Sequence, residues 1–166
     1  MILSVTGHRP PKLCGYSTKC RDKLFEFAVE ILDNMEPELV YTGMALGWDQ
    51  AIADACRWNG IAYKAVIPFK GFESRWPDFS KEIYYRLLED SDEVIYIHDT
   101  FEYDPEFMID RNIYMVDHSK LLLALYNGDK EGGTYNTFKY ALSTGIEIKN
   151  VWSAWLDWDK NRKLHR

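Results

Sequence analysis

Short apolar segments alternate with helix-like segments along nearly the whole chain, and this alternation limits the possible folds more than any other feature. The strand-like segments are 2–5, 39–41, 61–68, 93–97, 120–126 and 146–152. The helix-like segments, with apolar residues three and four positions apart, are 18–35, 49–58, 79–89, 107–116 and 134–143. Such alternation is typical of α/β proteins, in which a helix connects successive parallel strands. It predicts an open, mostly parallel sheet with helices on both faces.

The length of the chain and its last segment define the expected domain organisation. A chain of 166 residues is long enough to bury a sizeable core in one domain. No low-complexity run or linker divides it, so we expect a single domain over residues 1–152. Residues 153–166 form an aromatic and then charged tail, which is either docked on the domain or frayed.

The composition excludes several kinds of partner and location. A net charge of −6 provides no global field to attract duplex nucleic acid. No apolar run has the length of a membrane span, and no signal sequence begins the chain, so we expect a cytoplasmic protein without a membrane partner. Cys14, Cys20 and Cys56 fit no zinc spacing, and we expect them to be free thiols. We also expect no metal and no cofactor.

Aromatic residues are frequent, at 15% of the chain, with 6 Trp and 11 Tyr. A large core with Tyr and Trp at its margins explains most of them. The others would stack on a base or lie between the subunits of a homo-oligomer.

The strongest local signal is the bend Thr6-Gly7-His8-Arg9, which directly follows the first strand. Glycine lets the backbone approach a ligand closely, Thr6 and His8 offer hydrogen bonds, and Arg9 matches a pair of phosphate oxygens. The alternative is a structural turn in which Gly7 only adopts a positive φ. We favour an anion-binding role, because the end of a parallel strand faces the edge where ligands bind.

A second bend runs from Thr42 to Asp49, between a strand and a helix, and contains Gly43 and Gly47. Its spacing is neither the dinucleotide fingerprint nor the P-loop. Amide groups at the helix N-terminus near Gly47 nevertheless favour an anion. Asp49 is either the N-cap of this helix or a partner for a ribose hydroxyl, and Trp48 is a candidate for stacking on a base.

A third bend contains Gly132, Gly133 and Thr134 at the start of a later helix. Its two glycines can present successive amide groups to a phosphate, while Thr134 caps the helix and touches the ligand. A plain loop with a helix cap is the alternative. Asn136, in the first turn of the same helix, is a candidate for contact with a ribose or a base edge.

These three bends, in this order, resemble the SLOG superfamily, and the start Thr6-Gly7-His8-Arg9-Pro10 is similar to its YpsA-like branch. The resemblance covers most of the chain. It implies a Rossmann-like sheet with a pocket for a nucleotide or a nucleotide-derived ligand. The superfamily includes lonely-guy phosphoribohydrolases, which cleave nucleoside monophosphates, and DprA proteins, which bind single-stranded DNA.

The resemblance also bears on the reaction. Arg111 is similar to an arginine of the phosphoribohydrolases, whereas Asn112 stands where those enzymes commonly have lysine; a surface ion pair is the alternative for Arg111. The enzyme motif Gly-Gly-x-Gly-Thr-x-x-Glu is incomplete, because residues 132–139 lack the glycine that follows its Gly-Gly pair and lack its acid. The sequence therefore predicts a ligand-binding protein of the sensor type. A nucleoside monophosphate N-glycosidase, with Asp49 or Glu131 as its carboxylate, is the alternative.

Overall fold

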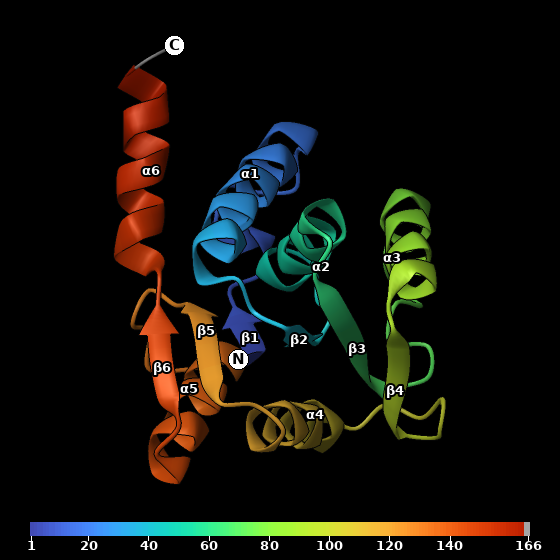
Figure 1. Ribbon diagram of the computed structural model, residues 1–166. Helices are drawn as coiled ribbons and strands as arrows, with labels where there is room; N and C mark the ends of the chain where they lie inside the picture. The colour runs from blue at the N-terminus through green and yellow to red at the C-terminus, as the bar shows by residue number, and fades with distance from the viewer. Residues whose placement is uncertain (165–166) are drawn as a thin grey trace.

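Six parallel strands form one open sheet in the computed structural model, which describes residues 1–164 (Figure 1). The strands are β1 (Ile2–Gly7), β2 (Leu39–Thr42), β3 (Ala62–Phe69), β4 (Glu93–His98), β5 (Leu121–Leu125) and β6 (Glu147–Asn150). Their order across the sheet is β4-β3-β2-β1-β5-β6, and every neighbouring pair is parallel. The predicted α/β architecture is confirmed, and the sheet is parallel throughout.

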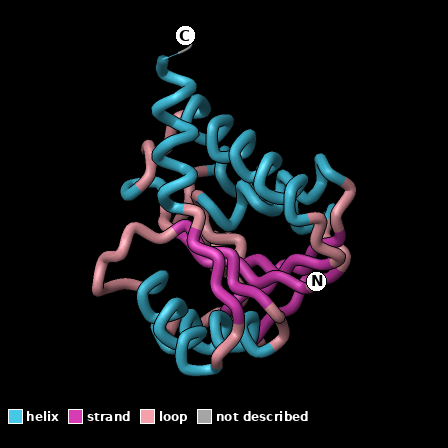
Figure 2. The backbone as a smooth tube through the Cα atoms, turned by 60° about the vertical axis from the view of Figure 1, so that its left-hand side comes forward, coloured by secondary structure: helices cyan, strands magenta, loops and turns pink. Residues whose placement is uncertain are grey.

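Helices cover both faces of this sheet. They are α1 (Thr18–Met35), α2 (Trp48–Asn59), α3 (Asp78–Asp90), α4 (Pro105–Asp117), α5 (Gly133–Thr144) and α6 (Trp152–Leu164), with a short 3-10 turn η1 (Pro10–Lys12). Figures 1 and 2 show α1, α2, α3 and α6 on one face, and α4 and α5 on the other. None of the helices in the described part of the chain has the length and apolar character needed to cross a membrane.

Strand β5 shows how the sheet forms a core on both of its faces. All five of its residues are buried, as the continuous apolar run predicts for a central strand. Because side chains alternate along a strand, Leu121, Leu123 and Leu125 pack in the large cluster beneath α1 and α2. Leu122 faces the opposite layer, where it packs with Val116 of α4 and Ala141 of α5.

The last predicted strand is too long at its C-terminal end. Residues 146–152 were expected to be extended, but β6 ends at Asn150 and α6 begins at Trp152. The side chain of Asn150 accepts hydrogen bonds from the amides of Tyr126 (3.1 Å) and Trp152 (3.2 Å), and its Nδ2 donates to the Tyr126 carbonyl (2.9 Å). These bonds complete the pairing with β5 and turn the chain into the helix.

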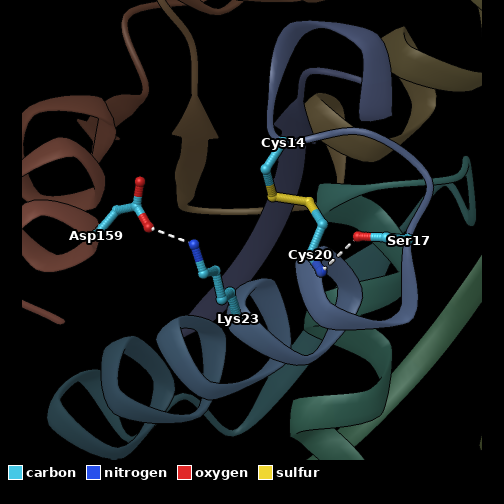
Figure 3. The surroundings of a disulfide bond; sticks show 5 residues. All are labelled: Cys14, Ser17, Cys20, Lys23 and Asp159. Carbon is cyan, nitrogen blue, oxygen red and sulfur yellow. Dashed lines mark hydrogen bonds and ion pairs between the residues drawn. A yellow bond between two sulfur atoms is a disulfide. The ribbon is translucent and has the colours of Figure 1, made fainter. Parts of the chain in front are cut away.

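The segment after this strand is docked on the domain as far as the structure describes it. Trp155 of α6 is buried against Phe27 of α1, with ring centroids 5.3 Å apart. An ion pair of 2.9 Å joins Lys23 of α1 to Asp159 of α6 (Figure 3). The docked alternative is therefore observed through Leu164, whereas the division into a domain and a separate tail stays a prediction.

The expectation of three free thiols is wrong for two of them. Cys14 and Cys20 form a disulfide with a Cα–Cα distance of 5.4 Å (Figure 3). The turn η1 folds the connection after β1 back over the first turn of α1, where Ser17 caps the helix by accepting from the Cys20 amide. This return path places the two sulfurs together. Cys56 is free and buried in the core.

Candidate ligand-binding site

The C-terminal ends of β1 and β5 define the point where the sheet connections change direction. From β1 the chain proceeds through β2 and β3 to β4, and it then returns to place β5 on the other side of β1. At such a point the two connecting loops diverge and leave a crevice in which α/β proteins bind ligands. Here two contacts join the loops: Nε2 of His8 accepts from the Asn127 amide (3.0 Å), and Lys12 pairs with Asp129 (2.8 Å).

His8, one of the predicted ligand-binding residues, also stabilises the fold. It is 4% exposed and contacts the rings of Tyr126 and Trp152. Burial lowers the pKa of His8, although its hydrogen bond with Asn127 opposes this shift. The imidazole is therefore neutral at neutral pH and acts as an acceptor that fixes the β5–α5 loop against the end of β1.

Two of the predicted phosphate-binding glycines are in close contact with other parts of the protein. A Cβ atom on Gly7 would overlap the indole of Trp48, and one on Gly47 would lie 2.8 Å from the carbonyl oxygen of His8. Gly47 is also the N-cap of α2, with a positive φ of 98°. These glycines allow the first and second bends to pack against each other.

Trp48 and Thr42 are turned away from the surface. Trp48 is fully buried beside Phe27, so its ring is not available for the stacking on a base that the sequence suggested. The Thr42 hydroxyl is also buried and donates to the carbonyl of Asp49 at 2.9 Å. Both side chains pack in the interior of the protein and stabilise the conformation of the second bend.

Gly43 and Arg111 form the closest contact between this bend and α4. Nη1 of Arg111 donates to the Gly43 carbonyl at 2.5 Å, and a Cβ atom on Gly43 would overlap the guanidinium. Nε donates to Asn112 at 2.7 Å, and the guanidinium lies 5.7 Å from the centre of the Phe72 ring. Arg111 is 4% exposed, so the surface ion pair considered from the sequence is not formed.

Asp49 is the most unusual group at this edge of the sheet. It is not the N-cap of α2, because Gly47 has that position, and its Oδ2 accepts from the Ala45 amide at 3.3 Å. Its Oδ1 is buried and has no hydrogen-bond partner in the described structure. Burial raises the pKa of Asp49 to about 6, against the opposing effects of Arg111, the Ala45 amide and Arg9.

The positive charge near Asp49 comes from two arginines in different environments. Burial lowers the pKa of Arg111 to about 10, which leaves it charged at neutral pH. Arg9 is exposed, and its guanidinium makes no hydrogen bond with the residues that the structure describes. Both arginines interact electrostatically with Asp49. The arrangement is a buried carboxylate beside one fixed and one free guanidinium.

The third bend lies at the end of β5, further along the same edge. Gly132 is the N-cap of α5 with a φ of 95°, and no side chain caps this helix. Gly132 and Gly133 are exposed, and a Cβ atom on either would meet nothing within 4 Å. Thr134 is partly buried and Asn136 is exposed. The structure describes no hydrogen bond between this bend and the other two, and Thr134 does not act as the predicted cap.

Sequence reasoning missed several residues that shape the site. Lys12, Asn127 and Asp129 connect the β1 and β5 loops, and Nε2 of Gln50 donates to the Met44 carbonyl at 3.0 Å. Met44 is fully buried with a positive φ of 62°, an uncommon conformation for a residue with a side chain. For Gln50 and Asn127 the available signal was an amide side chain directly beside Asp49 of the second bend and beside Gly128, respectively. No group of three metal-ligating side chains occurs among the described residues.

The six-stranded parallel sheet with helices on both faces defines a Rossmann-like fold of the α/β class. The model of the YspA SLOG family matches residues 3–153, and the chain belongs to this family. It is 33% identical to the SPbeta prophage-derived protein YoqJ of Bacillus subtilis, over 76% of this chain and 82% of YoqJ. The resemblance to the YpsA-like branch of SLOG is thereby confirmed.

Solved structures share this fold at low sequence identity. DNA processing protein A from Streptococcus pneumoniae has a TM-score of 0.63 and 18% identity, over 88% of this chain and 48% of that protein. DNA processing protein A from Helicobacter pylori, whose structure was described for its single-stranded DNA binding mode, has a TM-score of 0.63 and 13% identity, over 89% of this chain and 63% of that protein. The molybdenum cofactor carrier protein of Chlamydomonas reinhardtii has a TM-score of 0.53 and 15% identity, over 89% and 73%. This chain thus spans about half of the S. pneumoniae protein.

Proposed function

We propose that the protein binds a nucleotide or a nucleotide-derived ligand at the C-terminal edge of the sheet, between the β1, β2 and β5 loops. The observation that carries this proposal is the unpartnered Oδ1 of Asp49. A buried polar atom without a hydrogen bond is destabilising, and a ligand hydroxyl placed there would satisfy it. The ribose of a nucleotide offers such a group.

The surroundings of Asp49 suit the phosphate of the same ligand. The free guanidinium of Arg9 can form paired hydrogen bonds to phosphate oxygens. The uncapped N-terminus of α5, with exposed Gly132 and Gly133, offers amide groups and the positive end of the helix dipole. Thr6, Thr134 and Asn136, which the sequence also predicts as ligand contacts, lie at the same edge of the sheet. Ligand binding without turnover would suit a cytoplasmic sensor.

Isothermal titration calorimetry with adenosine and guanosine monophosphates, ribose 5-phosphate and inorganic phosphate tests this proposal. Wild-type protein is expected to bind at least one nucleotide. Arg9→Ala should weaken that binding by roughly tenfold, the effect of one charge-assisted hydrogen bond. Arg86→Ala, which removes an exposed arginine of α3, is the matched control and should bind like wild type. No heat with any of the four compounds would refute the proposal.

A second candidate function is N-glycosidic cleavage of a nucleoside monophosphate. It is favoured by the raised pKa of Asp49, because a buried carboxyl group near the anomeric carbon can exchange a proton or stabilise positive charge at neutral pH. If it operates, wild-type protein releases free base from a nucleoside monophosphate and Asp49→Asn does not. Binding without any base release at high protein concentration leaves the sensor function alone.

The structure offers less support for a nucleic-acid strand as the ligand. Single-stranded DNA binding needs a positively charged track along the backbone of the strand. At the β1 and β5 loops, Lys12 is already paired with Asp129, and Glu131 adds negative charge beside it. A small nucleotide therefore fits this edge better than a strand or a duplex.

A further inference from the structure

We propose that Phe101 and Tyr103, in the loop between β4 and α4, form the stacking site for the base of the bound nucleotide. This inference rests on the proposed function and specifies which end of the ligand lies where. Both rings are strongly exposed, Phe101 by 79% and Tyr103 by 70%. Their loop follows the C-terminal end of β4, so it lies on the same edge of the sheet as Arg9 and Asp49.

The two exposed rings belong to a loop that is held in place by several contacts. The amide of Lys70 donates to the Thr100 carbonyl at 2.9 Å, and its ammonium group pairs with Asp99 at 2.5 Å. The Thr100 hydroxyl accepts from the Glu102 amide. The last residue of the loop, Asp104, caps α4 through the amide of Glu106. A fixed loop presents its aromatic rings to a ligand without a large loss of conformational entropy on binding.

Each ring also has a defined seat. Phe101 packs beside Gly71, where a Cβ atom would lie 3.4 Å from Cδ1 of the Phe101 ring. The Lys70 ammonium group lies 5.9 Å from the centre of the Phe101 ring. Tyr103 packs edge-on against Phe69, with ring centroids 5.8 Å apart. Each ring therefore contacts the protein and still leaves most of its surface open to solvent, which stacking on a planar base requires.

A continuous set of aromatic contacts leads from these rings to the buried arginine of the candidate site. Phe69 stacks on Phe72 with a centroid distance of 6.1 Å, and the Phe72 ring lies 5.7 Å from the guanidinium of Arg111. Arg111 in turn contacts Gly43 in the second bend. This chain of contacts connects the two exposed rings to the bend beside Asp49, where the ribose and phosphate would bind.

The charges of the β4–α4 loop determine the orientation of the ligand. Glu102 and Asp104 in this loop and Glu106 in the first turn of α4 are exposed, and the positive charge of Lys70 is already paired with Asp99. Negative groups repel a phosphate but accept hydrogen bonds from the N–H groups of a base. The base therefore lies toward β4 and the phosphate toward the guanidinium of Arg9, which follows β1.

Calorimetry with adenosine, guanosine, cytidine and uridine monophosphates, compared with ribose 5-phosphate, tests this inference. In wild-type protein at least one nucleotide should bind more tightly than ribose 5-phosphate. Phe101→Ala and Tyr103→Ala should each reduce that advantage by roughly tenfold, as expected for one stacked base. Both should leave the affinity for ribose 5-phosphate unchanged, and Tyr103→Phe should keep the advantage. Trp58→Ala, which removes another aromatic side chain that is 73% exposed, is the matched control.

The outcomes separate the two proposals. If nucleotides bind no better than ribose 5-phosphate, or if the double variant Phe101→Ala with Tyr103→Ala keeps the full advantage of the base, the stacking site is refuted while the ligand site stands. If neither the nucleotides nor ribose 5-phosphate binds, both proposals fail. Because the two side chains are exposed, thermal unfolding of the variants should match that of wild type and thereby show that they are folded.

Discussion

The guanidinium of Arg111 occupies the space that a side chain at residue 43 would need. Its Nη1 donates to the Gly43 carbonyl at 2.5 Å, and a Cβ atom at that position would overlap the same group. The contact joins α4, on one face of the sheet, to the bend that begins α2 on the other face. It also holds the charge of Arg111 near Asp49.

Gly43→Ala should therefore displace Arg111 and destabilise the protein. Overpacking of this kind lowers the free energy of unfolding by about 1–3 kcal/mol, and the displaced charge should also weaken ligand binding. Gly133→Ala is the matched control, because its Cβ atom would meet nothing within 4 Å and its helical position tolerates alanine. Urea unfolding of both variants provides the measurement. Equal stability of the two would show that Arg111 adjusts freely.

Asp49 should make stability depend on pH in an unusual direction. Its pKa is raised from 3.8 to about 6 in the folded protein, so between these values the folded state binds more protons than the unfolded state. The free energy of unfolding should fall as pH rises through this window, by up to about 3 kcal/mol in total. Asp49→Asn lacks this effect.

The comparison of wild type with Asp49→Asn isolates this group. The lowered pKa of His8 acts in the opposite direction, because stability is lost as pH falls through the titration of that residue, but both proteins retain His8. Urea unfolding between pH 4 and 7 should show that the variant gains stability relative to wild type as pH rises. Parallel pH profiles would contradict the raised pKa of Asp49.

The disulfide should stabilise the connection between β1 and α1 by about 2 kcal/mol, as a short closed loop does. Cys14→Ser, at an exposed position, removes it with little loss of packing. Wild-type protein should lose stability on addition of a reductant, and the variant should not respond. Thiol titration of the unfolded, unreduced wild-type chain should detect only Cys56. Three reactive thiols would show that the bond does not form in solution.

Much of the fold followed from the alternation of strands and helices, because its periodicity is local. The end of β6 did not, since it depends on hydrogen bonds between Asn150, at the end of β6, and Tyr126, which directly follows β5 and is 24 positions away in the sequence. The disulfide was missed for a similar reason. Its pairing depends on the turn η1, which the sequence around Pro10 did not predict as a helical turn.

The glycine bends illustrate a second limit of sequence reasoning. The pattern predicted that a ligand approaches the backbone at Gly7, Gly43 and Gly47. It did not distinguish a ligand from a neighbouring side chain, and at Gly7 and Gly43 the neighbours are Trp48 and Arg111. The roles of the predicted residues as ligand contacts stay predictions, and the experiments on Arg9 and Asp49 address them.

The docking of α6 provides the last prediction, which concerns the stability of the domain. Trp155 is 4% exposed and packs on Phe27, whereas its neighbour Leu156 is 50% exposed. Trp155→Ala leaves a cavity between α6 and α1 and should lower the free energy of unfolding by about 3 kcal/mol. Leu156→Ala, one residue away on the same helix, should change it by no more than about 0.5 kcal/mol. If urea unfolding gives equal values for the two variants, α6 does not contribute to the core, and the segment after β6 behaves as an independent tail.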